Sequence, residues 1–239
     1  MVRPLVLHRR KGQCLDLPPK QRLERPVSLE AVEAEAFERA LQERIDDFRR
    51  RAWAGEVRRD AEALAVFTAL RQIASRHKLA ATTELVADLQ DRGEAGVVFT
   101  AFVATALALH RQLGQAHDGG PLIGAVPPAR RQRLVDAFQS GRSPVLIATY
   151  GTGGLGFTLH RARHVVLVER PWTPGDAEQA EDRCHRIGMG AALTSHWLQL
   201  GVADRLVDDL IASKAERISL LLQRQRALPA LVRQWLETV

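Results

Sequence analysis

Four short apolar runs in the second half of the chain constrain its fold more than any other feature. They cover residues 97–100, 145–149, 165–168 and 193–200 and are rich in Val, Ile and Leu. Helical patterns separate most of them, at about 103–113, 128–139 and 174–187. Continuous apolar strands that alternate with helices are typical of a parallel sheet, because crossover helices bury both of its faces. The sequence therefore predicts an α/β fold with a parallel sheet flanked by helices.

The first half of the chain has a different texture. Residues 1–27 are basic and marked by four prolines, which predicts an extended connector. Helices are expected at 28–51, with Ser28 as N-cap, at 59–76, and at 81–91 before Gly93. The pattern is helical again from Asp204 to the end. We expect three parts: a connector and helical lead-in (1–95), the α/β domain (96–200) and C-terminal helices that form a brace (201–239).

Composition excludes several classes of protein. Of the 239 residues, 46% are hydrophobic and 26% charged, as in ordinary globular domains. No apolar run approaches the roughly 18 residues needed to cross a membrane, and residues 1–11 lack the apolar stretch of a secretory signal. Cys14 and Cys184 are too few for a disulfide framework, and no His/Cys cluster has metal-ligand spacing. These features predict a cytoplasmic protein with no membrane partner and no metal site.

The chain is basic, with a net charge of +6, and only four of its 34 basic residues are lysines. Guanidinium groups pair bidentately with phosphates, so an excess of arginine suits a nucleic acid or nucleotide partner. A GC-rich genome that prefers arginine codons explains the same bias. Charge alone does not decide between these explanations.

The most specific local pattern runs from Gln179 to Gly188. On a helix, Gln179, Arg183 and Arg186 are spaced i, i+4 and i+7 and share one face. An adjacent apolar stripe is formed by Ala180, Cys184 and Ile187. Two guanidiniums held on one face suit a triphosphate whose charge spreads during phosphoryl transfer. The alternative is a solvated amphipathic helix with Asp182 and Arg186 as an i,i+4 ion pair.

A glycine loop after the second apolar run imitates a dinucleotide-binding fingerprint. Gly151, Gly153 and Gly156 satisfy G-x-G-x-x-G, and Glu169 ends the next strand. However, only the eight residues 157–164 separate the loop from that strand, which is too few for a crossover helix. The fingerprint also normally opens its fold, whereas this loop follows an earlier strand. A dehydrogenase is therefore disfavoured.

A complete ATP site is missing from the sequence. A Walker A loop needs Gly-Lys-Ser/Thr, and none of the four lysines follows a glycine. No Asp-Glu pair is present to coordinate Mg²⁺. This chain therefore cannot by itself cradle and activate ATP as a P-loop enzyme does.

Taken together, the motifs resemble the C-terminal lobe of the Swi/Snf family within helicase superfamily 2, in the family's order and at its spacings. The matching segments are 3–20 (the junction leaving the first lobe), 98–102 (motif IV), Gly124-x(6)-Arg131-x(6)-Phe138, 149–159 (motif V), Trp172-Thr-Pro174 (for Trp-Asn-Pro) and 179–188 (for Q-A-x-D-R-x-H-R-I-G-Q). Within the family, segments 169–176 and 179–183 are more similar to the annealing-helicase-like branch.

This resemblance implies a RecA-like lobe of an ATP-dependent translocase on double-stranded DNA. ATP and Mg²⁺ are then held mainly by a first lobe, in cis or in trans, and this chain alone is not expected to turn over. The resemblance implies that Arg183 and Arg186 are arginine fingers. It places nucleotide contacts at Gly153, Gly154, Gly156 and Gln179, and contacts to DNA phosphates at Thr100, Gly124, Thr149, Gly151 and Trp172. If the source is bacterial, a nucleoid-associated protein is expected.

The chain departs from the family pattern at several positions. Met189 replaces a glutamine, Thr158 an asparagine and Tyr150 a threonine, and Ala125 and Val126 stand where hydroxyls are usual. These departures weaken the DNA-contact assignments more than the arginine fingers, and ordinary turn and strand-end chemistry remains the alternative for each DNA contact. The rival function is a non-catalytic DNA-binding or regulatory module from a split or decayed translocase.

Overall fold

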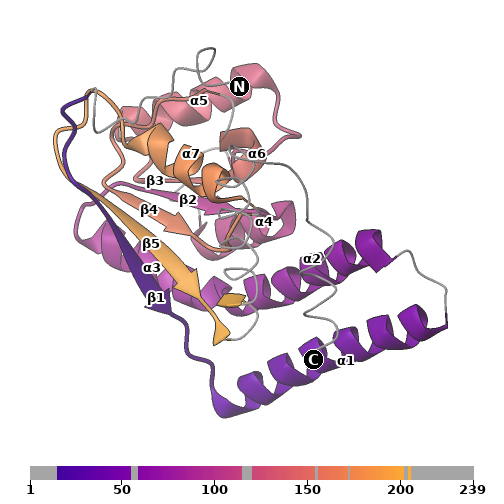
Figure 1. Cartoon of the computed structure of the whole chain (residues 1–239). Helices are drawn as coiled ribbons and strands as arrows, with labels where there is room; N and C mark the ends of the chain where they lie inside the picture. The colour runs from indigo at the N-terminus through magenta and orange to yellow at the C-terminus, as the bar shows by residue number, and fades with distance from the viewer. Residues whose placement is uncertain are drawn as a thin grey trace.

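A five-stranded parallel sheet forms the centre of the molecule (Figure 1). The computed structural model describes residues 15–54, 59–114, 120–153, 156–171, 173–201 and 204–205. The strands are β1 (Lys20–Pro26), β2 (Gly96–Thr100), β3 (Val145–Thr149), β4 (His164–Leu167) and β5 (Leu193–Gln199), in the spatial order β1-β5-β4-β2-β3. Every neighbouring pair is parallel. The predicted parallel sheet is confirmed.

Helices cover both faces of this sheet. On one face lie α3 (Leu79–Asp91) and α4 (Val103–Gln112), and on the other α5 (Pro128–Gln139) and α7 (Pro174–Cys184). Strand β2 shows the alternation, since Val97 and Phe99 join the core with α5 and α7 while Val98 joins the core with α3 and α4. Burial on both sides explains why the sequence reads as continuous apolar runs.

Two long helices, α1 (Ala31–Trp53) and α2 (Arg59–His77), lie side by side and extend away from the sheet (Figure 1). A small core of Phe37, Ala74 and Leu200 joins them to the end of β5. The three predicted lead-in helices are therefore present, within a few residues of the expected bounds. The remaining element, α6 (Tyr150–Gly153), is a single turn after β3.

The predicted connector contains a strand that periodicity did not reveal. Residues 20–26 form β1, which pairs with β5 at the edge of the sheet. Its sequence, Lys-Gln-Arg-Leu-Glu-Arg-Pro, is almost entirely exposed and has no apolar alternation. Charged edge strands are common because side chains there face solvent while the backbone pairs on one side only. The division of the chain at residue 95 stays a prediction, and residues 1–14 lie outside the described part.

Helix α7 is shorter than predicted. It ends at Cys184, because His185 adopts ψ 83° and leaves the helical region. Arg186 therefore lies beyond the helix, and the prediction that it shares a helical face with Gln179 and Arg183 is wrong. The apolar stripe also stops at Cys184, since Ile187 is 68% exposed. Residues 156–163, all described, form no helix, in agreement with the argument against a dinucleotide-binding unit. Most of the predicted C-terminal helices, from residue 206 onward, lie outside the described part.

Candidate functional site

Helix α7 begins at a side-chain cap. The hydroxyl of Thr173 accepts a hydrogen bond from the amide of Asp176 at 3.1 Å, and Pro174 occupies the first helical position. Threonine and asparagine are both N-cap residues, and proline is favoured just after the cap because it has no amide to leave unpaired. Threonine thus preserves the capping chemistry of the Trp-Asn-Pro pattern. Trp172 lies outside the described residues.

The end of α7 meets the segment that follows the glycine loop. The amide of Leu159 donates to the carbonyl of Arg183 at 2.8 Å, and Nη1 of Arg186 donates to the hydroxyl of Thr158 at 3.0 Å. Two segments that the sequence analysis treated separately, 156–159 and 183–186, therefore form one unit, which we call the arginine corner. It joins both predicted arginine fingers to Gly156, whose φ of 87° favours glycine.

The predicted nucleotide-binding residues lie on both sides of this corner. The side chain of Arg183 is half-buried, whereas that of Arg186 is exposed. Gln179 is exposed on α7, about one helical turn before Arg183. Gly153 ends α6, and Gly154 lies outside the described residues. The corner thus offers one exposed guanidinium beside exposed loop and helix positions.

A fully buried carboxylate, Glu181, holds α7 to the sheet. It accepts hydrogen bonds from Lys20 (3.0 Å), Arg22 (2.7–3.1 Å), Ser195 (2.8 Å) and Trp197 (3.1 Å). Burial alone would raise the pKa of this carboxyl, but the hydrogen bonds from Arg22 and the charge of Lys20 lower its pKa below the ordinary value. Glu181 is therefore ionised inside the protein and binds two strands, β1 and β5, to the helix that carries Arg183.

The sequence analysis named Glu181 only as part of a motif. Its neighbours on the buried side of α7 are Ala177, Ala180 and Cys184, which are at most 5% exposed. One ionisable residue within an apolar stripe at helical spacing is the available signal, because a buried carboxylate requires a buried partner. The partners could not be found in the same way, since Lys20 and Arg22 are about 160 residues distant and belong to the undetected strand β1.

Four of the five predicted DNA contacts gather at the carboxyl ends of β2 and β3. Thr100 and Thr149 are register partners at the ends of these strands, and Gly151 follows directly in α6. A parallel bridge between Leu122 and Ala148 brings Gly124 to the same edge. We call Thr100, Gly124, Thr149 and Gly151 the carboxyl edge.

The hydroxyls of the carboxyl edge have partners inside the protein. Thr100 is fully buried and donates to the carboxylate of Glu169 at 2.8 Å, and the hydroxyl of Thr149 lies 2.9 Å from that of Thr152. Glu169 is itself buried and also accepts from Ser75 on α2 and from the amide of Ala101. Gly124 and Gly151 are exposed. At this edge the accessible polar groups are those of the main chain.

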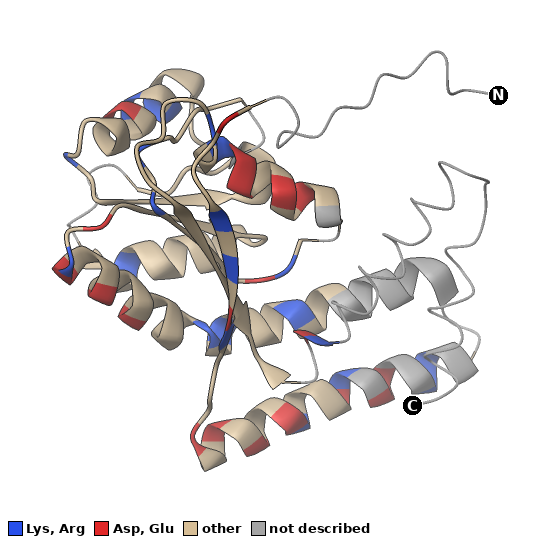
Figure 2. Cartoon of the chain, turned by 60° about the vertical axis from the view of Figure 1, so that its left-hand side comes forward, with Lys and Arg blue, Asp and Glu red and all other residues tan. Residues whose placement is uncertain are grey.

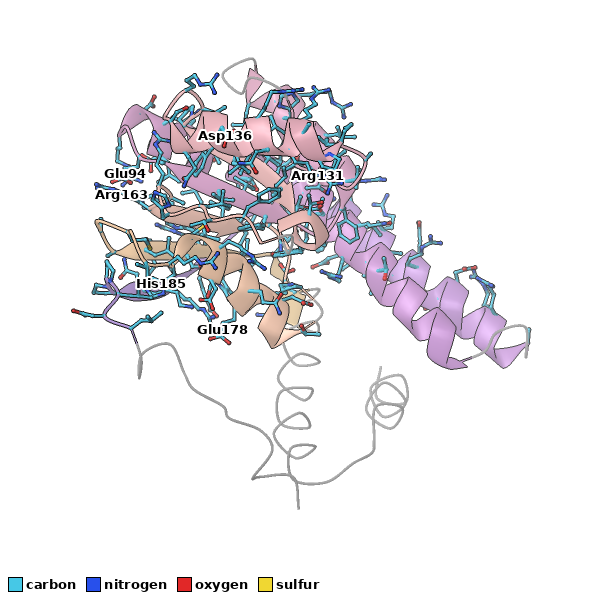
Figure 3. All side chains as sticks on the ribbon, turned by 90° about the horizontal axis from the view of Figure 1, so that it is seen from above. Glu94, Arg131, Asp136, Arg163, Glu178 and His185 are labelled. Carbon is cyan, nitrogen blue, oxygen red and sulfur yellow. The ribbon has the colours of Figure 1, made fainter. Side chains whose placement is uncertain are left out.

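Arg131 explains the G-x(6)-R spacing. Its Nη2 donates to the carbonyl of Gly124 at 2.6 Å, and its Nε donates to the carbonyl of Val126, also at 2.6 Å. Arg131 lies in α5 (Figure 3), so the turn at 124–126 is held by the helix that follows it. The arginine of this motif stabilises the turn in this chain.

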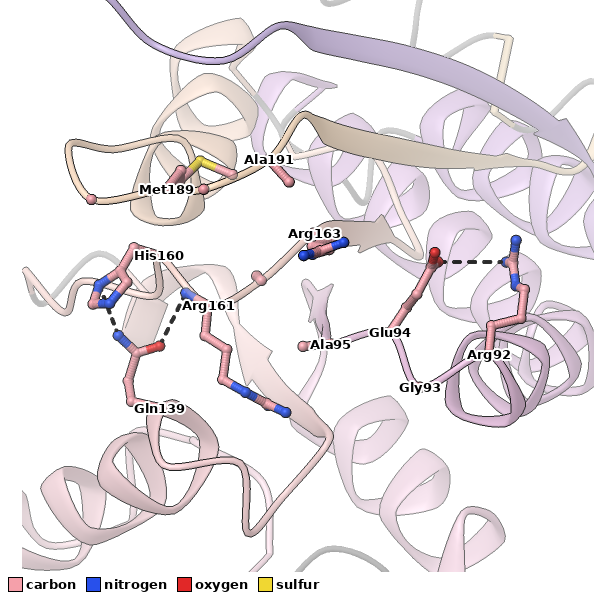
Figure 4. Close-up of a pocket in the computed structure, with 13 residues that line it drawn as sticks. Arg92, Gly93, Glu94, Ala95, Gln139, His160, Arg161, Arg163, Met189 and Ala191 are labelled. Atoms are coloured by element: carbon pink, nitrogen blue, oxygen red, sulfur yellow. Dashed lines mark hydrogen bonds and ion pairs between the residues drawn. The ribbon is translucent and has the colours of Figure 1, made fainter.

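A cavity of about 560 Å³ lies away from both groups of predicted residues (Figure 4). It is lined by segments 92–95, 160–163 and 188–191, which precede β2, β4 and β5, and by Gln139. Arg161 donates to the carbonyls of Phe138 (3.0 Å) and Ser143 (3.2 Å), so this side chain has a structural role. None of the predicted site residues lines this cavity.

Comparison with known proteins identifies a domain and relatives. Residues 77–188 match the helicase conserved C-terminal domain. The chain is 27% identical, over 99% of its length, to the putative ATP-dependent helicase/translocase YwqA of Bacillus subtilis, of which it covers 28%. It is 39% identical, over 39% of its length, to the DNA annealing helicase and endonuclease ZRANB3 of Bos taurus, of which it covers 9%.

The fold is also found in a solved structure. The Sulfolobus solfataricus SWI2/SNF2 ATPase core in complex with double-stranded DNA matches with a TM-score of 0.64 at 22% identity, over 90% of this chain and 49% of that chain. The chain thus spans about half of that core and less than a third of the curated relatives named above.

Among the described residues, no helix combines the length and apolar character needed to span a membrane. Within the same part of the chain, no three His, Cys, Asp or Glu side chains gather as metal ligands.

Proposed function

The chain contains a helicase conserved C-terminal domain and is homologous to Swi/Snf-type helicases and translocases, and we propose that it is the second RecA-like lobe of an ATP-driven motor on double-stranded DNA. In this role it supplies arginine fingers to ATP bound by a first lobe. The arginine corner is the observation that carries the proposal. There a packed helix end presents the exposed guanidinium of Arg186 next to Arg183, on a segment joined to the glycine loop.

The residues of the corner fit the charge of a triphosphate. Arg186 is exposed, and its hydrogen bond to Thr158 uses only one of its five N–H donors. Mg·ATP, held by the first lobe, supplies the transferable phosphoryl group and neutralises part of its charge. Arginine fingers in related NTPases contribute roughly 10³–10⁵ in rate, or about 4–7 kcal/mol of barrier. Gln179 and the amides of Gly153, Gly154 and Gly156 then face the nucleotide.

The carboxyl edge is proposed to contact the DNA backbone. Contacts to phosphates are independent of sequence, as a translocating motor requires. The exposed main chain at Gly124 and Gly151 suits this role, and in the proposal Thr100 and Thr149 shape the edge while Trp172 adds a further contact. Closure of the two lobes around ATP and DNA, followed by reopening after hydrolysis, then moves the motor along the duplex.

The decisive experiment is reconstitution with the first lobe. The purified chain should show negligible ATPase activity with or without DNA, and a first lobe carrying a P-loop, fused or added, should restore DNA-stimulated hydrolysis. In that assembly Arg183→Ala should reduce turnover by about 10³-fold or more and leave ATP binding nearly unchanged. Substantial hydrolysis by the chain alone, or normal kcat in the Arg183→Ala assembly, contradicts the proposal. Salt-sensitive duplex binding that no first lobe converts into hydrolysis would instead favour a non-catalytic DNA-binding module.

A further inference from the structure

The segment that leads into β1 contacts α7 on both sides of Arg183. The carbonyl of Pro18 accepts a hydrogen bond from Nε2 of His185 at 2.7 Å. Lys20 and Arg22 both bind the carboxylate of Glu181. Residues 18–22 therefore hold positions 181 and 185, and Arg183 lies midway between them. We call residues 18–22 the clamp segment.

We infer that the clamp segment positions the arginine fingers, with Lys20 and Arg22 acting on Arg183 and Arg186 through α7. The inference rests on the proposed function, and it adds positioning residues that no motif contains. None of these side chains is placed at the nucleotide. They act by fixing the last turn of α7, which carries Arg183 and leads directly into Arg186.

The charge distribution supports this inference. Figure 2 shows basic positions on β1 near acidic positions on α7. Lys20 also lies 3.8 Å from Asp182, and Arg22 stacks 4.9 Å from the ring centre of Trp197. The bond to Glu181 raises the pKa of the Arg22 guanidinium. Only the carboxylate of this pair is fully buried, and a buried charge needs its cationic partners held in place, so Lys20 and Arg22 fix the position of Glu181.

The path from the clamp segment to Arg183 is short and rigid. Glu181 is fully buried and two residues from Arg183, on a helix whose other buried residues pack on the sheet. A small displacement of the clamp segment is therefore transmitted almost unchanged through α7 to the arginine corner. Because misplacement of a catalytic group by about 1 Å can cost about 10²-fold in rate, the position of the clamp segment can control turnover.

The first test uses amide hydrogen exchange in the full chain. Arg22→Met removes the main partner of Glu181. Because the Arg22 side chain is 46% exposed, the substitution leaves no cavity in the core. Arg25→Met is the matched control, because Arg25 lies in the same strand and bonds His196 instead, at 3.2 Å. We expect the amides of residues 175–188 to exchange at least tenfold faster in Arg22→Met only. Equal exchange of these amides in both variants overturns the inference.

The second test measures turnover with the first lobe present. Arg22→Met should lower kcat by about 10²-fold while the KM for ATP changes less than about twofold, because the first lobe holds the nucleotide. Arg22→Lys keeps a cationic donor and should restore most of the loss. A rise in KM at constant kcat, or an equal loss in Arg25→Met, overturns the inference.

The two proposals fail in different ways. If Arg183→Ala retains normal kcat, the proposed function fails, and the exchange experiment still decides whether the clamp segment holds α7. If Arg183→Ala loses turnover and Arg22→Met does not, only the positioning role of the clamp segment fails.

Discussion

The arginine corner and the carboxyl edge differ in how their polar groups are used, although both hold residues that the sequence marked as functional. At the carboxyl edge the hydroxyls of Thr100 and Thr149 are buried and bonded to other side chains. At the corner Arg186 is exposed and donates to the hydroxyl of Thr158. A polar motif residue can therefore serve the fold or a ligand, and burial with its bonding partners distinguishes the two uses.

The largest expected effect lies at the corner. If Arg186 is an arginine finger as proposed, Arg186→Ala should lower kcat of the two-lobe assembly by about 10³-fold or more, because an exposed cation is lost. The free energy of unfolding of the chain should change by no more than about 0.5 kcal/mol, as for most surface substitutions. ATPase assays and urea titrations measure the two quantities. A large loss of stability with normal turnover would assign Arg186 to the fold.

Among the residues near the carboxyl edge, substitution of Lys78 should cause the largest loss of stability. Its ammonium group is fully buried, bonds the carbonyls of Val168 and Leu198, and pairs with Asp204 at 2.6 Å. Burial lowers the pKa of Lys78, and the charge of Asp204 opposes this effect. Lys78→Met leaves Asp204 uncompensated and should cost about 3–5 kcal/mol of unfolding free energy.

The matched control for Lys78 is Arg92→Met, which removes an exposed pair with Asp88. Such surface pairs contribute about 0–1 kcal/mol, and urea titration compares the two variants. Similar losses in both would mean that the buried ion pair adds nothing beyond a surface one.

Thr100→Val provides a test within the carboxyl edge itself. It removes one donor from Glu169 and should cost about 1–3 kcal/mol of stability. The affinity of the folded variant for duplex DNA should stay within about twofold, because the hydroxyl faces the interior. Fluorescence anisotropy with labelled duplex measures this affinity. A tenfold loss would show that the hydroxyl contacts DNA.

Lowering the pH should destabilise the fold next to β1 without any substitution. The rings of His164 on β4 and His196 on β5 stack on each other, with Arg25 donating to His196 and Glu94 pairing with His164 at 2.5 Å. Burial, with His164 and Arg25 nearby, lowers the pKa of His196 from 6.5 to about 4, and burial also lowers that of His164. Arg92 and Arg163 oppose protonation of this pair as well.

These pKa shifts determine how the free energy of unfolding changes with pH. Since the folded pKa values are depressed, the unfolded chain binds protons first, and stability present above pH 6.5 is lost as the pH falls toward 4. The slope is at most about 1.4 kcal/mol per pH unit for each proton. Urea titrations between pH 7 and 4 test this, and His196→Asn should flatten the curve. An unchanged slope in that variant would exclude the histidine pair as the cause.

The sequence predicted the inner strands to within about one residue because they are buried on both faces and read as apolar runs. It missed β1 because an exposed edge strand is held by its backbone, which leaves no periodicity in the side chains. It also extended α7 by three residues, since Ile187 continued a stripe that His185 interrupts. Local propensity does not report where a helix must end to meet another segment.

For the site, the motifs named candidate residues, whose roles stay predictions, and did not show how these residues contact one another. The contact of Arg186 with Thr158 depends on bringing a loop after β3 to the end of α7, which only the topology provides. The roles of Lys20 and Arg22 depend on the same long-range arrangement. Thr100 and Thr149 lie at strand ends, as the sequence predicted, but their contact as DNA-binding residues stays a prediction. The burial of Thr100 depends on Glu169 and α2, which no local pattern connects to it.

The pairing of β1 with β5 joins side chains 173 positions apart, as in the bond between Gln21 and Thr194. During synthesis almost the whole described chain must leave the ribosome before its first strand finds a neighbour, and such non-local pairing slows folding. A fragment that starts after residue 26 would leave the backbone of β5 unpaired, and an open strand of this kind recruits other chains into aggregates. We therefore expect soluble expression to need residues 20–26, although the match to the helicase conserved C-terminal domain begins only at residue 77.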